Sequence, residues 1–276
     1  MKLFRWRDRG EAAQTTRTPL AQAIALYQAG RYAEAEAEAR SVVAARSRSR
    51  DDTYAPLAMG IAALAAGAQG RHADAVTTYD ELLPVFGRVF GAEHPQTLKL
   101  RSDRAQALSA LARYAECEAE CAAVAQVAAR GTGPDMALIT TAARNGQIFA
   151  LTALGRHSEA EALACEALAA HRETDRFTLV LRLGLARSLN GQDRHEEALA
   201  EAERADELRR SLTQEQRRSE TGAVELAMAT ALLGLGRGTE ARTLAAAAQD
   251  ACRTTFGPDH RRTAEAQALL DRIDSA

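Results

Sequence analysis

Apolar and polar residues alternate along most of this chain with the period of an α-helix. In residues 195–210, for example, Ala and Leu recur every three or four positions, and Glu and Arg fill the positions between them. A helix with that spacing has one apolar face and one charged face. Aromatic residues make up only 4% of the chain, and the enrichment in Val, Ile and Thr that strands need is missing. The pattern predicts an all-α protein.

Six similar short turns interrupt the helical pattern. They begin at residues 30, 70, 112, 155, 193 and 236, and arginine is the second residue of each: Arg31, Arg71, Arg113, Arg156, Arg194 and Arg237. Successive arginines are 38 to 43 residues apart, which gives a repeat of about 42 residues. A period of that length is typical of a solenoid built from repeated supersecondary units.

Small and large apolar residues recur at fixed distances from these arginines. Four residues after each arginine the chain has a small residue: Ala35, Ala75, Cys117, Ala160, Ala198 and Ala241. Eight residues before, the residue is small in five of six cases: Ala23, Ala63, Ala105, Ile148, Ala186 and Ala229. Five residues before, leucine dominates: Leu26, Ala66, Leu108, Leu151, Leu189 and Leu232. Small residues let two helices approach closely and large ones fill the remaining space, so each unit is expected to be a helix, a turn and a second helix.

These columns, the Gly-Arg-Tyr turn and the junction GAEHPQTL at 91–98 resemble tetratricopeptide repeats. The resemblance is to the 42-residue type found in kinesin light chains and many actinobacterial regulators, and it covers residues 18–276. It implies a single right-handed superhelical solenoid of about six helix pairs. Residues 263–273 are then expected to form a C-terminal capping helix, and residues 1–17 a basic and aromatic tail.

The sequence Phe-Gly-x-acid-His occurs twice, around His94 and His260. Each copy begins 19 residues after a turn arginine, so both occupy the same place in the repeat and should link one helix pair to the next. His72, His157 and His195 each follow a turn arginine, and only His171, near a helix end, lies outside the register. Since register explains five of the six histidines, we predict no catalytic residue, metal or cofactor.

Two further sets of residues have a structural and a functional interpretation. Cys117 and Cys121 are four residues apart and share a helix face; we interpret them as core residues, with a redox-sensing thiol pair as the alternative. An acid stands three residues after every turn arginine, where it should stabilise a helix N-terminus: Glu34, Asp74, Glu116, Glu159, Glu197 and Glu240. No Ser-His-Asp arrangement, phosphate loop or nucleotide fingerprint is present, so an enzyme is the weakest interpretation.

The resemblance also implies where a partner would bind. Tetratricopeptide repeats line a concave groove with their first helices, and by analogy the partner-binding residues are Lys99, Ser102, Asp103, Gln106, Ser109, Asn145, Phe149, Thr152, Arg187 and Asn190. Kinesin-light-chain-like repeats place paired asparagines there, and of these the chain keeps only Asn145. A solvated inner surface without a ligand is the alternative.

Charge and hydropathy narrow the class of partner. The net charge is −2, which gives no global field for nucleic acid, and no apolar stretch approaches the roughly 18 residues of a membrane span. Residues 1–10 lack the apolar core of a secretory signal, so a bacterial cytoplasm is expected. The favoured function is a non-enzymatic scaffold that binds a peptide, helix or protein. The alternatives are a regulatory sensor of a small peptide or metabolite that signals through a separate effector, and a self-associating scaffold.

Overall fold

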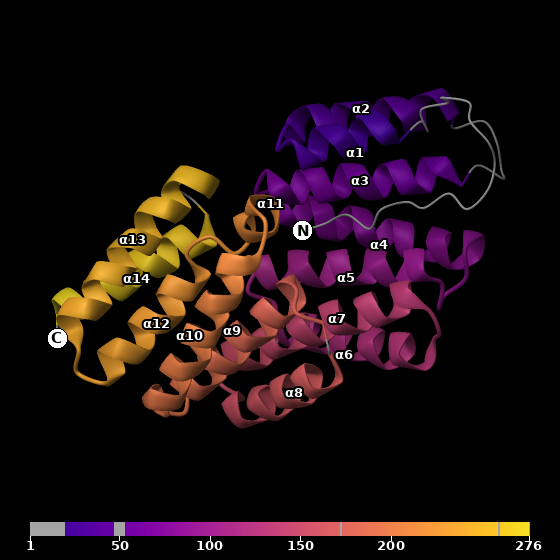
Figure 1. Cartoon of the computed structure of the whole chain (residues 1–276). Coiled ribbons are helices and arrows are strands. Elements are labelled where there is room, and N and C mark those ends of the chain that lie inside the picture. The colour runs from indigo at the N-terminus through magenta and orange to yellow at the C-terminus, as the bar shows by residue number, and fades with distance from the viewer. Residues whose placement is uncertain (1–19, 47–52, 172, 259, 276) are drawn as a thin grey trace. The chain divides into compact units, whose positions relative to one another are not determined.

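The computed structural model describes residues 20–46, 53–171, 173–258 and 260–275. The predicted tail at 1–17 lies outside these residues. Every regular element within them is a helix, which confirms the all-α prediction (Figure 1). The helices are α1 (Ala21–Gln28), α2 (Tyr32–Arg46), α3 (Tyr54–Ala68), α4 (His72–Val89), α5 (Pro95–Ala110), α6 (Tyr114–Arg130), α7 (Pro134–Ala153), α8 (His157–Ala170), α9 (Arg176–Asn190), α10 (His195–Ser211), α11 (Gln214–Arg218), α12 (Ala223–Gly234), α13 (Gly238–Phe256) and α14 (Arg261–Asp274).

Within the described residues the helices form six antiparallel pairs followed by α14. The pairs are α1 with α2, α3 with α4, α5 with α6, α7 with α8, α9 with α10, and α12 with α13. Each predicted turn arginine lies directly before the second helix of its pair. The short helix α11 interrupts the connection between α10 and α12. α14 extends slightly beyond the predicted cap at both ends.

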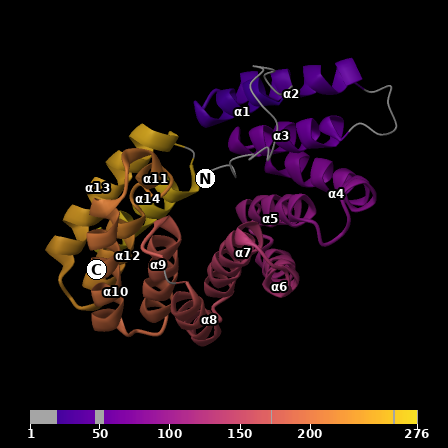
Figure 2. The same ribbon diagram turned by 45° about the vertical axis from the view of Figure 1, so that its right-hand side comes forward.

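The chain divides into two compact units, and the boundary falls within α7, between Ala143 and Arg144. In the unit before the boundary, α1 to α6 pack in chain order, and the first helices α1, α3 and α5 also contact one another. Both views show α3, α4 and α5 following one another (Figures 1 and 2). In the unit after the boundary, α9, α12 and α14 contact one another in the same way. Each unit therefore has a layer of first helices, which we call its first-helix layer.

The predicted columns of small residues lie in the contacts between helices. All six residues of the column after the arginine are buried, and Ala35, Ala160 and Ala198 have 0% of their surface exposed. The column eight residues before the arginine and the leucine column are buried as well. Ala160 packs in one cluster with Leu151, Leu181 and Ala198, which come from α7 to α10. The repeat period thus marks the positions where neighbouring helices touch.

The first copy of Phe-Gly-x-acid-His forms the start of α5. His94 is the N-cap, and its Nδ1 accepts a hydrogen bond from the backbone N–H of Gln96 at 3.2 Å. The imidazole stacks on the ring of Phe90 with centroids 5.5 Å apart. The hydroxyl of Thr97 donates to the carbonyl oxygen of Gly91 at 2.7 Å, which ties the loop to the new helix. Every side chain named here serves the junction.

The second copy repeats this arrangement at the start of α14. His260 is the N-cap, Nδ1 accepts from the N–H of Arg262 at 3.2 Å, and the ring stacks on Phe256 at 4.4 Å. Thr263 donates to the carbonyl of Gly257 at 2.9 Å. The prediction of one structural junction used twice is confirmed.

The residue before each turn arginine has a positive φ. Glycine fills this position in four turns, at φ values of 74° to 84°, but Ala112 (φ 58°) and Asp193 (φ 59°) fill it in the other two. A side chain with a Cβ is strained in this left-handed region, and alanine has no polar group to offset the strain.

We therefore expect Ala112→Gly to raise the free energy of unfolding by about 1 kcal/mol, because it relieves that strain. Urea denaturation of the full chain measures the change. Gly155→Ala, at the equivalent position of the next turn, serves as the reverse substitution and should lower stability. A loss of stability in Ala112→Gly would show that the turn is not strained.

Overpacking tests the close approach of the helices. Ala160→Leu inserts a larger side chain between α8 and its neighbours and should lower the free energy of unfolding by about 1–3 kcal/mol. Ala162 is exposed on the same helix, so Ala162→Leu is the matched control and should change stability little. Equal effects of the two variants in urea denaturation would contradict the packing described here.

Candidate functional site

The turn arginines pair with the acid that follows three residues later. In the fourth turn, Arg156 Nη2 lies 2.6 Å from Glu159 Oε2, and Arg113, Arg194 and Arg237 repeat the arrangement at 2.6 to 2.7 Å. The second turn is the exception, with 3.7 Å between Arg71 and its acid. The acids lie in the first turn of the second helix, as predicted. Their ion pair with the preceding arginine was not predicted.

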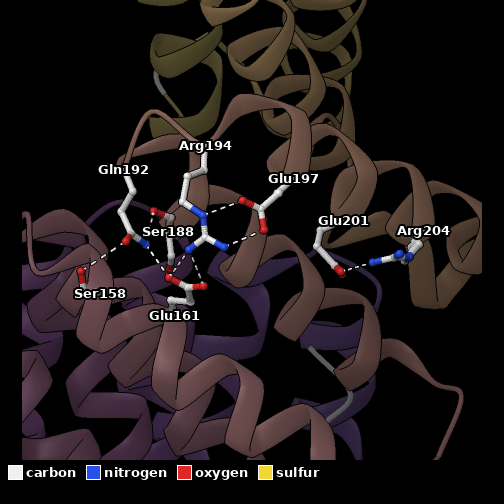
Figure 3. Close-up of polar contacts among 8 residues, drawn as sticks. All are labelled: Ser158, Glu161, Ser188, Gln192, Arg194, Glu197, Glu201 and Arg204. Carbon is white, nitrogen blue, oxygen red and sulfur yellow. Dashed lines mark hydrogen bonds and ion pairs between the residues drawn. The ribbon is translucent and has the colours of Figure 1, made fainter.

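Arg194 also bridges two successive helix pairs. Its Nη1 lies 2.7 Å from Glu161 Oε1 of α8, while its other nitrogens bind Glu197 (Figure 3). Gln192 Nε2 donates to Glu161 Oε2 at 2.8 Å, and Gln192 Oε1 accepts from Ser158 Oγ at 3.2 Å. A carboxylate of one pair is thus held by the turn of the next. We call Glu161, Gln192 and Arg194 the turn clamp.

The same contacts recur in the unit before the boundary. Glu36 of α2 accepts hydrogen bonds from Gln69 Nε2 at 2.9 Å and from Arg71. Glu36 and Glu161 both stand five residues after a turn arginine, and Gln69 and Gln192 both stand two residues before the next one. The recurrence shows that this network serves the packing of repeats and is not a ligand site.

The turn clamp makes stability depend on pH. Hydrogen bonds from Gln192 and Arg194 lower the pKa of Glu161. A carboxyl group whose pKa is lower in the folded state stabilises the fold above its unfolded pKa, near 4.3, and this contribution is lost as the pH falls through the folded value.

We expect Glu161→Gln to melt below the wild type at pH 7, with the difference in Tm shrinking as the pH is lowered toward 3. Thermal unfolding followed by circular dichroism at several pH values measures this. Glu207→Gln, at an exposed position of α10, is the control and should follow the wild type throughout. A Tm difference that stays constant across this range would exclude the carboxylate of Glu161 as its source.

The predicted groove residues of α5 divide into buried and accessible ones. Asp103 is only 7% exposed and forms an ion pair with Lys99, 2.5 Å from Nζ to Oδ2. Ser102 donates to the carbonyl of Leu98 within the helix at 3.1 Å. Gln106 is exposed and Ser109 is partly exposed. Gln106 is therefore the side chain of this set best placed to contact a partner.

Asp103 also lies near a tyrosine of the first helix. Burial raises the pKa of Tyr27, and the nearby Tyr32 and Asp103 raise it further. The carboxylate of Asp103 on α5 thus acts electrostatically on a side chain of α1, although the two helices belong to different pairs.

The predicted groove residues after the boundary divide in the same way. Asn190 is 8% exposed: its Nδ2 donates to the carbonyl of Ala227 at 3.1 Å, and its Oδ1 lies 3.2 Å from His195 Nδ1. Thr152 donates to the carbonyl of Ile148 at 2.9 Å. Both side chains contribute to packing.

The other three predicted residues after the boundary, Asn145, Phe149 and Arg187, are partly exposed. Phe149 is covered by a residue that sequence analysis missed. The guanidinium of Arg261 lies over its ring, with 4.5 Å from Cζ to the ring centroid. Arg261 belongs to α14, which the repeat pattern identified only as a cap. The signal in the sequence was the difference between the two junction copies, HPQT and HRRT.

The cysteines fit the core interpretation. Cys117 and Cys121 are both buried on α6. Hydrogen bonding to Cys117 and burial both raise the pKa of Cys121, which favours its thiol form. No group of three or more His, Cys, Asp or Glu side chains in the described ranges is arranged to hold a metal ion. Nor does any helix described here have the length and apolar character required to cross a bilayer.

Comparison with protein families gives matches to two family models, each described as tetratricopeptide repeat, at residues 53–119 and 226–262. One match falls in each compact unit. The chain contains tetratricopeptide repeats. The recurrent turns that lie outside the two matches share the columns of buried small residues with those inside them, so the same helix packing recurs in both units. No curated protein matches the sequence.

Solved structures confirm the tetratricopeptide fold. Kinesin-light-chain TPR-like repeats of Podosopora anserina align with a TM-score of 0.59 and 21% identity, covering 69% of this chain and 92% of that one. A tetratricopeptide repeat protein of Parabacteroides merdae aligns with a TM-score of 0.63 and 15% identity, covering 92% of this chain and 82% of that one. PlcR of Bacillus thuringiensis, solved with the peptide PapR7 and DNA, aligns with a TM-score of 0.58 and 17% identity. The alignment covers 78% of this chain and 74% of that one. All three structures share the tetratricopeptide fold with this chain.

Proposed function

We propose that this protein is a non-enzymatic scaffold that binds a peptide, a helix or a protein partner on its first-helix layers. The observation that carries the proposal is the division among the predicted groove residues. Asp103 and Asn190 are occupied by contacts within the stack, whereas Gln106 and Asn145 keep exposed surface. Polar side chains that packing does not require are the ones available to a ligand.

The fold supports this function. Stacked helix pairs expose an extended surface on their first helices, and proteins of this architecture use such surfaces for binding. The likeness to PlcR, which was solved with a bound peptide, is consistent with a peptide as the ligand. Tetratricopeptide-repeat proteins are generally scaffolds without catalytic activity, and no catalytic arrangement is needed to explain the residues described here.

Affinity capture from cells of the native host tests the proposal. We expect the double variant Gln106→Ala/Asn145→Ala to capture less of the partner than the wild type while its Tm stays the same, because both side chains are at least partly exposed and truncation leaves the core intact. Quantitative mass spectrometry of the captured proteins measures the loss.

The matched control is Glu81→Ala/Glu207→Ala. These two residues are exposed on the second helices α4 and α10, so the control should capture the partner like the wild type. Equal capture by both double variants would place the partner elsewhere on the protein.

The likeness to PlcR in its peptide complex also favours a second candidate, a sensor that binds a small peptide or metabolite and acts through a separate effector protein. A sensor should gain stability when its ligand is added without any protein partner. A rise in Tm on addition of a low-molecular-weight extract of host cells would favour this candidate over the scaffold.

A further inference from the structure

Histidine follows the turn arginine in three of the six turns, and two of these histidines contact the next helix pair. The imidazole of His157 lies against the backbone of Gly191, and the imidazole of His195 lies against Gly234. A side chain on either glycine would collide with the ring. Both glycines stand three residues before the next turn arginine, so the same contact joins α8 to the end of α9 and α10 to the end of α12.

The two histidines differ in their polar surroundings. Asn190 Oδ1 lies 3.2 Å from His195 Nδ1, and Asp193 Oδ1 lies 3.6 Å from His195 Nε2. A protonated imidazole is a donor at both ring nitrogens, and His195 has an oxygen atom near each of them. The Nδ1 atom of His157, by contrast, is buried and has no hydrogen-bond partner among the described residues. Protonation of this atom would bury an N–H group that has no acceptor.

The charged groups on the elements packed around His157 do not supply that acceptor. They belong to α8, the end of α9, the turn that follows it and the start of α10: Arg156, Glu159, Glu161, Arg187, Asp193, Arg194, Glu196 and Glu197. Glu159 is paired with Arg156, and Glu161 is paired with Arg194. Residues 145–153, at the end of α7, carry no charge. The site of His157 therefore suits a neutral ring.

We propose that His157 makes the packing of α8 against α9 sensitive to mild acid, because this contact accommodates a neutral imidazole and not an imidazolium ion. A buried N–H group without an acceptor costs free energy, whereas water solvates the ion in the unfolded chain. The unfolded state therefore takes up a proton more readily as the pH falls through about 6.5, where histidine ordinarily titrates. Stability is fully present above this pH and declines below it.

The same repeat position behaves in this way in the other unit. His72 follows the turn arginine Arg71, and burial lowers the pKa of its imidazole. The position after the turn arginine is thus one where packing opposes a charged ring unless, as at His195, oxygen atoms lie beside its nitrogens.

This sensitivity to acid goes beyond the proposed scaffold function and does not depend on it. Its test uses no binding partner and none of the predicted groove residues. Failure of either proposal therefore leaves the other unaffected.

Thermal unfolding of the full chain by circular dichroism, from about pH 7.5 to about pH 5.5, tests the proposal in a range above the titration of ordinary carboxyl groups. His157→Gln removes the ionisable ring and keeps a polar side chain. We expect the Tm of this variant, relative to that of the wild type, to rise by about 2–4 °C as the pH falls across this range. The reason is that the wild type loses stability that the variant does not.

His195→Gln is the matched control. His195 stands at the same repeat position and also lies against a glycine, but its ring nitrogens have oxygen atoms nearby. Protonation of His195 should therefore leave its contact intact. The Tm of this variant, relative to that of the wild type, should not rise as the pH falls.

Hydrogen exchange of the wild type keeps the test decisive if His157→Gln does not fold. The amides of Ala160 and Gly191 are hydrogen-bonded to the carbonyls of Arg156 and Arg187 at the two sides of the contact. After correction for the intrinsic exchange rate, we expect these amides to lose more protection than those of α14 when the pH is lowered.

Three results would overturn the proposal. The first is a Tm difference between His157→Gln and the wild type that stays constant across the pH range. The second is an equal rise in His195→Gln, and the third is unchanged protection of the Ala160 and Gly191 amides in the wild type.

Discussion

The close approach of helices at small side chains is the constraint on which this structure depends. A single alanine at each crossing lets two helices pack closely enough for the leucines beside it to fill the interface. Because neighbouring pairs supply the apolar surface that each pair lacks, stability is the sum of many similar interfaces. This is why the same residue type returns every 42 residues or so, and why Ala160 and Ala198 are fully buried in one cluster.

Polar contacts add a second layer of specificity to that packing. The turn clamp joins Glu161 of one helix pair to Gln192 and Arg194 of the next. Such a contact is partly exposed to solvent, so its contribution to stability is modest. It does, however, fix which side chains face each other across the interface. Alanine packing alone does not fix this, because the alanine side chain has no hydrogen-bond donor or acceptor.

The sequence predicts most of the fold, because packing in a repeat depends on residues that recur. The buried columns, the six turns and the two junctions around His94 and His260 all follow from register. The ion pairs of the turns could not be predicted from register. An acid in the first turn of a helix is already explained by its favourable interaction with the helix dipole, so its presence does not indicate that it also pairs with the preceding arginine. The burial of Asp103 and Asn190 could not be predicted either, because their faces of α5 and α9 are set by contacts with residues far away in the chain.

Arg262 of α14 shows how a residue that departs from the repeat can have a local role. A residue that recurs in every repeat has a structural role in the repeat. A residue found in only one copy needs a separate explanation. Gln96 and Arg262 occupy the same place and donate the same backbone hydrogen bond to a histidine cap, so the cap does not require arginine. The side chain of Arg262 instead donates to the carbonyl oxygens of Ser219 and Thr221, and it lies 3.6 Å from the carboxylate of Glu220. These contacts tie the start of α14 to the segment that precedes α12, so an arginine that departs from the repeat is explained by one local packing contact.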